Sequence, residues 1–197
     1  MEKNISSGFF GTRNALLAGE CASALALAYV SSPASAATYT VSNDTELRDA
    51  ITTANADGDS SATIQLTADF AVSATNLPPP TKPITIDTQG FTSSNPRFAN
   101  AAQLVTLVGT FGGPFNIANS AAFNNGTISG VAGMTASTLN NNSTLVNNNT
   151  INAGSGSAST ASGIGVDIRA GSTLINNGII KGWIAEQVGG LLFSWAR

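Results

Sequence analysis

The chain has 197 residues, 10% of them charged, and a formal net charge of −3 at pH 7. Its length suits one domain with a buried core, or such a domain preceded by a leader. The negative charge gives no attraction to nucleic acid or anionic lipid, so nucleic-acid binding is not expected. Histidine is absent from the sequence, which excludes Ser-His-Asp and Cys-His nucleophilic sites and most catalytic zinc sites.

The middle of the chain is uncharged. No Asp, Glu, Lys or Arg occurs from Phe98 to Val166, and the polarity there comes from Asn, Ser and Thr. These side chains form hydrogen bonds without the desolvation cost of an ion. Because the same stretch is rich in aliphatic residues and has no charge repulsion, we expect it to fold rather than to be disordered.

Residues 1–36 are predicted to be a secretory signal peptide. Lys3 and Arg13 supply its positive charge, and an uncharged apolar core follows at 21–30. That core is far shorter than the ~18 to 20 residues needed to span a membrane. A small-x-small cleavage site ends at Ala36. We expect cleavage after Ala36 or one residue later, and export of the remaining chain.

A lipoprotein signal is the alternative interpretation of the leader. The sequence LLAGEC at 16–21 resembles a lipoprotein box, but Glu20 separates Cys21 from the preceding small residue. The apolar core also continues after Cys21, where a mature lipoprotein is polar. Cys21 is the single cysteine, so it has no partner for an intramolecular disulfide. Cleavage after Ala36 would leave a cysteine-free protein.

Residues 37–60 are predicted to form a strand and a short helix that cap the following segment. Tyr39 and Val41 alternate with threonines, as in a strand. Asn43 is the expected helix N-cap, and Glu46 completes a capping box. An apolar stripe at helical spacing follows: Leu47, Ala50, Ile51 and Ala54.

Residues 61–182 are predicted to form short strands separated by turns rich in Gly, Asn and Ser. Three units consisting of an apolar residue and two asparagines begin 23 and 29 residues apart, at Phe123, Val146 and Ile175. Each unit is followed, five residues after its first residue, by an isoleucine: Ile128, Ile151 and Ile180. The larger gap contains residues 152–163, which we interpret as a loop insertion. A repeat of this length with two or three short strands predicts a solenoid, in which each repeat is one coil.

Stacked coils place equivalent side chains above one another, because neighbouring parallel strands lie ~4.8 Å apart. We expect the aliphatic residues to form a continuous core. The asparagine pairs are expected at the corners, where they bond along the stack and tolerate left-handed turn backbone. The 122 residues from 61 to 182 allow about five coils, a stack of roughly 25 Å.

Three stretches resemble the repeats of bacterial autotransporter passenger domains: STLINNGIIKG (172–182), FNNGTISG (123–130) and GIGVDIRAGSTLINNG (163–178). Residues 39–72 resemble the first segment of pectate-lyase-like right-handed β-helices, in which a strand and a short helix cap the first coil. The resemblance implies an all-β fold, a right-handed parallel β-helix. It also implies display on, or release from, the surface of a Gram-negative bacterium, with a C-terminal membrane translocator barrel.

The sequence departs from that family after residue 182. The divergent tail at 183–197 abandons the asparagine repeat and includes no series of ~10-residue membrane strands. We therefore expect a truncated or frameshifted fragment that holds the first coils and lacks the translocator barrel. Three aromatic residues of the tail are expected to cover the open end of the stack rather than to bind sugars: Trp183, Phe193 and Trp195.

Candidate catalytic residues are few. Asp167 and Arg169 share one face of a predicted strand, and pectate-lyase-like enzymes use aspartates for calcium and a basic residue as proton acceptor. An exposed ion pair is the simpler interpretation, because a polysaccharide-degrading site needs several carboxylates on neighbouring coils. Asp87 stands alone, and Ser60 in the GDSS motif lacks a histidine base. We predict no catalytic, cofactor-binding or metal-binding residue, no cofactor and no enzyme activity.

The predicted function is structural or adhesive. Long flat faces suit many weak contacts with host or surface glycans or proteins, or with copies of the same chain. The alternative is a secreted lyase-like β-helix enzyme acting on acidic polysaccharide, with Asp167 and Arg169 in its site. Glycosylation sequons begin at Asn125, Asn142 and Asn148 and are expected by chance in an asparagine-rich repeat.

Overall fold

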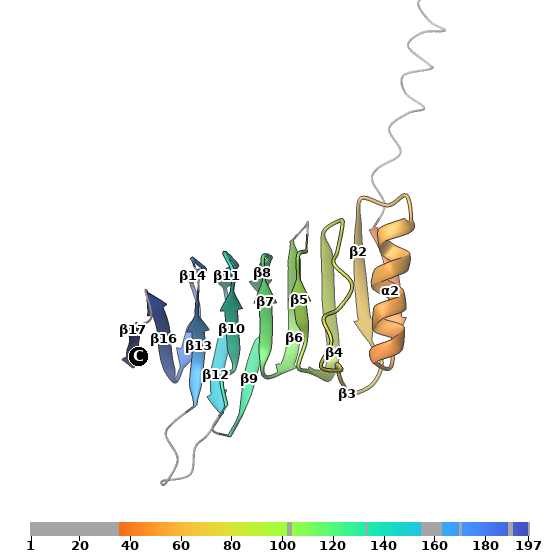
Figure 1. Cartoon of the computed structure of the whole chain (residues 1–197). Helices are drawn as coiled ribbons and strands as arrows, with labels where there is room; N and C mark the ends of the chain where they lie inside the picture. The colour runs from red at the N-terminus through yellow and green to blue at the C-terminus, as the bar shows by residue number, and fades with distance from the viewer. Residues whose placement is uncertain are drawn as a thin grey trace, which may run out of the picture. The chain divides into compact units, whose positions relative to one another are not determined.

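The computed structural model describes residues 36–101, 104–132, 134–154, 163–169, 171–188 and 191–196. These residues belong to one compact unit, 36–197. Cys21 and the predicted signal peptide up to residue 35 lie outside the described residues. In the described unit a helix near the N-terminal end is followed by strands stacked side by side, coloured from orange to blue in Figure 1.

The strands form three rows that run along the stack. The first row contains, in spatial order, β1 (Ala36–Val41), β2 (Ser61–Leu66), β4 (Ile84–Ser94), β6 (Val105–Gly112), β8 (Ala121–Asn124), β11 (Thr144–Asn147) and β14 (Thr173–Asn176). The second row contains β3 (Phe70–Ala71), the second halves of β4 and β6, β9 (Thr127–Ala132), β12 (Thr150–Gly154) and β15 (Ile179–Lys181). The third row contains β5 (Arg97–Ala99), β7 (Phe115–Ala118), β10 (Ser137–Asn140), β13 (Ile164–Ile168), β16 (Trp183–Val188) and β17 (Leu191–Ala196).

Pairing is parallel along all three rows as far as β16 in the described part of the chain. The later coils contribute one strand to each row, so that β8, β9 and β10 form one coil and β11, β12 and β13 form the next, whereas β4 and β6 each run through the first and second rows. Between 121 and 182 the described strands form no antiparallel hairpin. The predicted all-β fold with parallel, solenoid-like stacking is therefore confirmed.

The register of the rows follows the sequence repeat. Val146 of β11 pairs with Phe123 in the preceding coil and with Ile175 in the following coil. The isoleucines five residues further on pair with one another in the same way. The 29-residue spacing thus contains an insertion between equivalent positions, although the expected loop lies mostly at 155–162, outside the described residues.

Alternate residues of the strands point into a continuous core. In β2, Ala62, Ile64 and Leu66 are buried and the residues between them are partly exposed. The third row adds Phe98 and Phe115, whose ring centroids lie 6.3 Å apart with the ring planes tilted by 60°. Such an aromatic pair contributes ~0.5–1.5 kcal/mol beyond the burial of its surface. The core is thus a column of apolar side chains that extends through successive coils.

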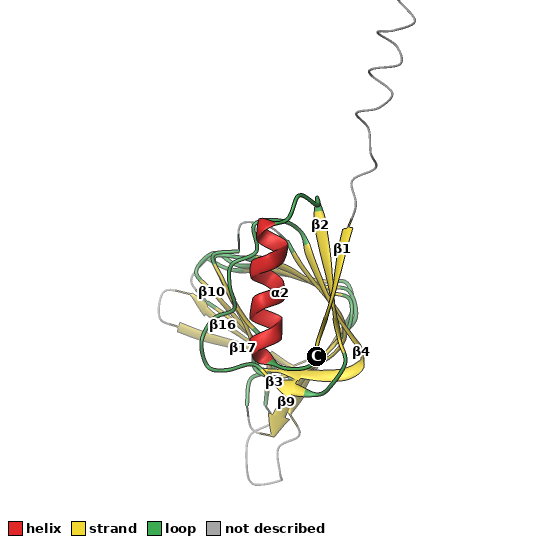
Figure 2. Ribbon diagram, turned by 90° about the vertical axis from the view of Figure 1, so that its right-hand side faces the viewer, coloured by secondary structure: helices red, strands yellow, loops and turns green. Residues whose placement is uncertain are grey.

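Helix α2 (Asp44–Ala56) covers the N-terminal end of this core and contacts β1 and β2. Figure 2 looks along the stack and shows α2 lying across that end. The Asn43 side chain accepts a hydrogen bond from the Glu46 N–H at 2.9 Å, which confirms the predicted N-cap. The Glu46 carboxylate accepts from the backbone N–H of Ser42 at 2.6 Å rather than from that of Asn43. The whole predicted apolar stripe is buried, namely Leu47, Ala50, Ile51 and Ala54.

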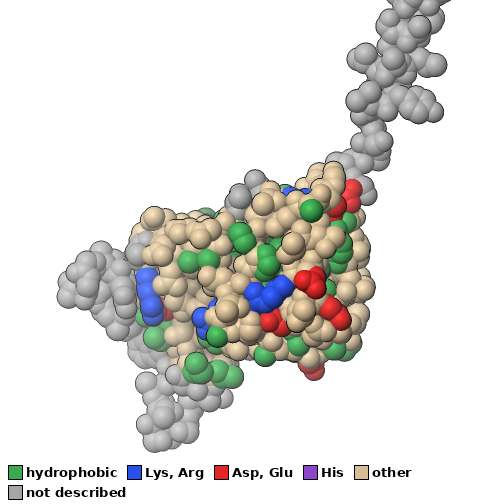
Figure 3. All heavy atoms as spheres, turned by 45° about the vertical axis from the view of Figure 1, so that its right-hand side comes forward, with side chains coloured by type: hydrophobic (Ala, Val, Ile, Leu, Met, Phe, Trp, Pro, Cys, Tyr) green, Lys and Arg blue, Asp and Glu red, His purple; other side chains and the backbone are tan. Residues whose placement is uncertain are grey.

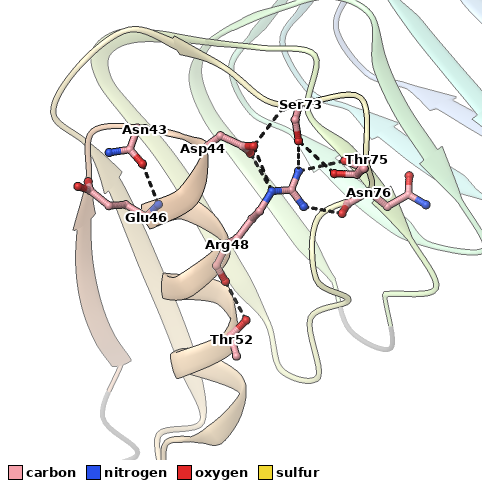
Figure 4. A network of polar contacts seen from close by, with 8 residues as sticks. All are labelled: Asn43, Asp44, Glu46, Arg48, Thr52, Ser73, Thr75 and Asn76. Carbon is pink, nitrogen blue, oxygen red and sulfur yellow. Dashed lines mark hydrogen bonds and ion pairs between the residues drawn. The ribbon is translucent and has the colours of Figure 1, made fainter.

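Arg48 connects α2 to the loop that follows β3 by hydrogen bonds, as Figure 4 shows. Its Nε lies 3.1 Å from Oδ1 of Asp44, one turn earlier on the helix. Its Nη2 donates to Oγ of Ser73 at 2.8 Å and to the carbonyl of Thr75 at 3.1 Å, and its Nη1 donates to the carbonyl of Asn76 at 2.7 Å. Partial burial raises the pKa of Asp44, but hydrogen bonds from Arg48 and Ser73 outweigh burial and hold this pKa below its ordinary value.

Asp57, which follows α2, is held from two sides. Lys82 forms an ion pair with its carboxylate, and the Tyr39 hydroxyl of β1 donates a hydrogen bond to it. Lys82 also donates to the carbonyl of Asp59 at 2.7 Å. The hydrogen bond from Lys82, and then that from Tyr39, lowers the pKa of Asp57 to about 2. The same contact with Asp57 raises the pKa of Tyr39 to about 12.

We expected the paired asparagines both to bond along the stack and to adopt left-handed turn backbone, but in the structure different residues do these two things. Among the described residues, the non-glycine positions with positive φ are Gln89, Asn95, Asn100, Asn119, Asn141 and Asn142. The last four follow third-row strands, where the chain returns to the first row. The first asparagines of the repeat units (Asn124, Asn147 and Asn176) are not among them. In the coils that carry the asparagine pairs, the left-handed asparagines therefore lie at the corner after the third row and not at the corner of the pairs.

The stack continues beyond residue 182, where the sequence repeat stops. β16 pairs in parallel with β13 and completes the third row of the last coil, and β17 then pairs with β16 in the antiparallel direction. The asparagine pairs mark only the corner between the first and second rows, so third-row strands carry no sequence signal of the repeat. In the described residues, no helix has the length and apolar character required to cross a membrane.

Lowering the pH from 5 to 2 should destabilise the fold partly through Asp57. Its pKa is about 2 in the folded chain and ~3.9 in an unfolded chain. The unfolded state therefore binds the proton first, and stability that is present above pH ~4 is lost as the pH falls toward 2. We expect the melting temperature of Asp57→Asn, measured by circular dichroism, to fall less steeply than that of the wild type. The control is Asp49→Asn, an exposed change within α2. Equal slopes in all three proteins would contradict this role of Asp57.

Candidate functional site

A buried ladder of asparagine side chains runs along the corner between the first and second rows. Asn124, Asn147 and Asn176 are the last residues of β8, β11 and β14. Nδ2 of Asn124 donates to Oδ1 of Asn147 at 2.7 Å, and Nδ2 of Asn147 donates to Oδ1 of Asn176 at 2.7 Å. The first two side chains are fully buried. The expected bonding of stacked asparagines along the corner is thus confirmed.

The same amides also hold the backbone of the corner. Nδ2 of Asn124 donates to the carbonyl of Thr150 in the next coil at 3.2 Å, and Nδ2 of Asn147 donates to the carbonyl of Ile179 at 3.4 Å. Oδ1 of Asn124 accepts from the N–H of Gly126 at 3.2 Å. Each inner asparagine therefore connects two coils and closes the turn that follows it. A buried amide with such partners avoids the ~1–3 kcal/mol penalty of an unsatisfied polar group.

A second ladder lies beside the first and faces solvent. Its members, Asn125, Asn148 and Asn177, are exposed. Nδ2 of Asn148 donates to Oδ1 of Asn125 at 2.9 Å, and Nδ2 of Asn177 donates to Oδ1 of Asn148 at 3.0 Å. These donors point toward the N-terminal end, opposite to those of the inner ladder. The outer ladder presents a row of amide groups at the regular spacing of the coils.

Charged side chains gather near the cap. Six of the acidic residues lie between 44 and 69, whereas the segment from Phe98 to Val166 carries no charge. Figure 3 shows the acidic side chains on the right of the view, toward the cap, and largely uncharged polar surface over the rest of the described face. The cap charges that form the Arg48 and Lys82 networks bind the helix to its neighbours and leave no open cluster of carboxylates there.

The structure pairs Asp167 with Arg169 as predicted, but the pair is not exposed as expected, because the Asp167 side chain is buried. Nε of Arg169 lies 2.6 Å from Oδ2 of Asp167, whose side chain is buried in β13 while that of Arg169 is partly exposed. The register partners of Asp167 on the adjacent strands are Thr138 and Ala185, so no second carboxylate lies beside it in the row. Oδ1 of Asp167 is buried without a hydrogen-bond partner. Within the described residues, no group of three or more His, Cys, Asp or Glu side chains could hold a metal ion.

The other candidates are dispersed. Asp87 lies in β4 between Gln65 and Val108 of the neighbouring strands and accepts a hydrogen bond from the backbone N–H of Gln89 at 3.0 Å. Ser60 is exposed immediately before β2. The tail residues belong to β16 and β17, but the described part of the structure does not include the side chains of Trp183, Phe193 and Trp195.

One hollow that the sequence does not predict opens at the C-terminal end of the stack. It has a volume of about 660 Å³ and is lined by Ile168, Leu174, Asn176, Gly178, Ile179, Ile180 and Ile184. The lining is almost entirely aliphatic and belongs to the last two described coils. The sequence does contain a signal for this hollow, because Ile179 replaces the polar Thr150 of the preceding coil and stands next to a second isoleucine.

Comparison with models of known protein families, with curated proteins and with solved structures finds no match. The resemblance to passenger domains therefore depends on the repeats, the cap and the leader of this sequence.

Replacing Asn147 should cost far more stability than replacing its exposed neighbour. Asn147→Ala removes the inter-coil bonds that a fully buried amide makes with Asn124, Asn176 and the carbonyl of Ile179. We expect a loss of about 2–3 kcal/mol in the free energy of unfolding in urea. Asn148→Ala, in the exposed outer ladder, should cost less than ~1 kcal/mol. Equal losses for the two variants would contradict the structural role of the inner ladder.

Proposed function

We propose that this chain is part of an exported passenger of the autotransporter type, which acts by presenting surface for adhesion or self-association. The leader, the cap and the repeats, which occur in the order typical of that family, support the proposal, as does the parallel stack. The proposed fold is a right-handed β-helix, in agreement with the strong preference of parallel crossovers for that hand. The proposed location is the periplasm, cell surface or medium of a Gram-negative bacterium, with the C-terminal membrane translocator barrel that the family implies.

The exposed asparagine ladder is the observation that carries this proposal. Asn125, Asn148 and Asn177 offer amide donors and acceptors in a row, with ~4.8 Å between coils. Amides without charge suit hydroxyl groups of glycans, polar side chains of matrix proteins, and the same ladder on another copy. One such contact exchanges a hydrogen bond with water for another and is weak, so useful affinity requires many contacts at once.

Catalysis is not part of the proposed function. The one residue pair considered for a lyase, Asp167 and Arg169, is engaged in an ion pair and has no neighbouring carboxylate in its row. A polysaccharide lyase or hydrolase requires carboxylates that converge on one groove. No observation on the described residues favours the enzyme over the adhesive surface.

The proposal is tested with the full chain expressed in a Gram-negative host, purified after export and coupled to beads at several densities. The amino terminus of the purified protein should be Ala37 or Thr38. Clumping of the beads, or their retention on arrays of glycans and matrix proteins, should rise steeply with density because the contacts are multivalent. The triple variant Asn125→Ser, Asn148→Ser and Asn177→Ser should reduce this binding by about tenfold.

The control changes three exposed threonines far from the ladder, namely Thr38→Ser, Thr45→Ser and Thr53→Ser, and should bind as the wild type does. Absence of clumping and retention at every density would contradict the adhesive function. Unsaturated products released from an acidic polysaccharide with calcium, and lost in Arg169→Ala, would instead support the lyase.

A further inference from the structure

The last coil ends in unpaired strand edges on two of its three sides. In the described residues, β14 pairs with β11 and β15 pairs with β12, and neither strand has a neighbour on its other side. On the third side β17 pairs with β16 and occupies the next position in the row. An open edge of this kind presents free N–H and C=O groups that can pair with another strand.

The inner ladder is also incomplete at this end. Asn124 and Asn147 each donate to the asparagine of the following coil and to a backbone carbonyl of that coil. Nδ2 of Asn176 instead donates only within its own turn, to the carbonyl of Gly178 at 3.2 Å, among the described residues. In the outer ladder Asn177 uses its Nδ2 toward Asn148, and among the described residues its Oδ1, unlike those of Asn125 and Asn148, accepts no bond from a following asparagine. The terminal corner therefore offers a donor on Asn176 and an acceptor on Asn177.

Apolar surface is exposed around this corner. Leu174 is partly exposed, whereas its register partner in the preceding coil, Leu145, is fully buried. Ile175 and Ile179 are 46% and 56% exposed, and the residues that they pair with in the preceding coil are only partly exposed. Leu174 and Ile179 are among the residues that line the aliphatic hollow of about 660 Å³. From Thr173 to Lys181 the last coil carries one charged residue, Lys181. The opposite end of the stack differs, since α2 covers its core.

We propose that this end binds an extended, uncharged polypeptide segment of the same repeat pattern, which adds to β14 and β15 as the next parallel coil. The pattern is an apolar residue followed by two asparagines, with an isoleucine five residues after the apolar one. Its asparagines continue both ladders, its first apolar residue stacks over Ile175, and its isoleucine stacks over Ile180. Because β17 stands at the same level on the third side, the segment has to cover only two sides. This binding uses the end of the stack, whereas the proposed adhesive function uses its side.

The test titrates the full-length processed protein into a fluorescent peptide with the sequence of residues 143–154, and anisotropy reports binding. The control peptide has serine in place of the asparagines that correspond to Asn147 and Asn148. We expect saturable binding of the repeat peptide and binding of the serine peptide weaker by about tenfold or more. Hydrogen exchange should show new protection in β14 and β15 when the repeat peptide is bound.

Two variants of the protein locate the site. Asn176→Asp still accepts the bond from Asn147 but has no outward donor, and Ile179→Lys places a charge on the open edge. Both should weaken binding by about tenfold or more. Val131→Lys, which changes another strand residue that is 51% exposed, should bind as the wild type does.

Circular dichroism establishes that each variant is folded, and the peptide control and the exchange pattern remain decisive if one variant is not. The proposal is overturned if no saturable binding occurs, if the serine peptide binds equally, or if protection appears away from β14 and β15. It is also overturned if folded Ile179→Lys binds as tightly as Val131→Lys. None of these results bears on the density-dependent adhesion of the side surface.

Discussion

In-register parallel stacking is the constraint on which the rest of this structure depends. When each coil lies directly over the last, every side chain has its own equivalents as neighbours at the strand spacing. Apolar residues then form a continuous column, and asparagines can bond to asparagines because an amide is both donor and acceptor. The ladder of Asn124, Asn147 and Asn176 is the direct result.

The same constraint accounts for where charge is found. A carboxylate or ammonium group repeated in every coil would face its like at close range, which is destabilising in a sheet. The uncharged segment from Phe98 to Val166 forms much of the stack, while the ion pairs of Arg48 and Lys82 belong to the cap. In the cap the side chains next to a charged residue do not belong to repeated positions, so Arg48 and Lys82 can donate to carboxylates and carbonyls of distant segments. Opposite charges therefore fix the geometry around the cap, whereas the ion pair of Asp167 and Arg169 in the stack is local to β13 and the residue that follows it.

Sequence alone predicts what repeats or is local. The corner ladder follows from the spacing of the units at Val146 and Ile175, and the helix start follows from Asn43, because both signals lie within short stretches. The bonds of Arg48 to residues 73–76 could not be predicted, since they join segments with no shared pattern. The left-handed backbone of residues such as Asn119 was not predicted. Asparagine is favoured both for stacking of its amide and for positive φ, so the sequence does not tell which of the two a given asparagine does. The continuation of the third row into β16 escaped it as well, because the asparagine repeat stops before that strand.

Engineered disulfides measure the stacking register most directly. In a full chain carrying Cys21→Ser, the pair Thr144→Cys and Thr173→Cys joins two register partners of β11 and β14. Their Cα atoms are expected ~4.8 Å apart, within the range that a disulfide bridges, whereas Thr144→Cys with Ile175→Cys is displaced to ~8 Å. Mild oxidation should close an intramolecular disulfide in the first protein and not in the second, as judged by mass and by reduction-dependent mobility. Closure in the displaced pair, with none in the aligned pair, would contradict in-register parallel stacking.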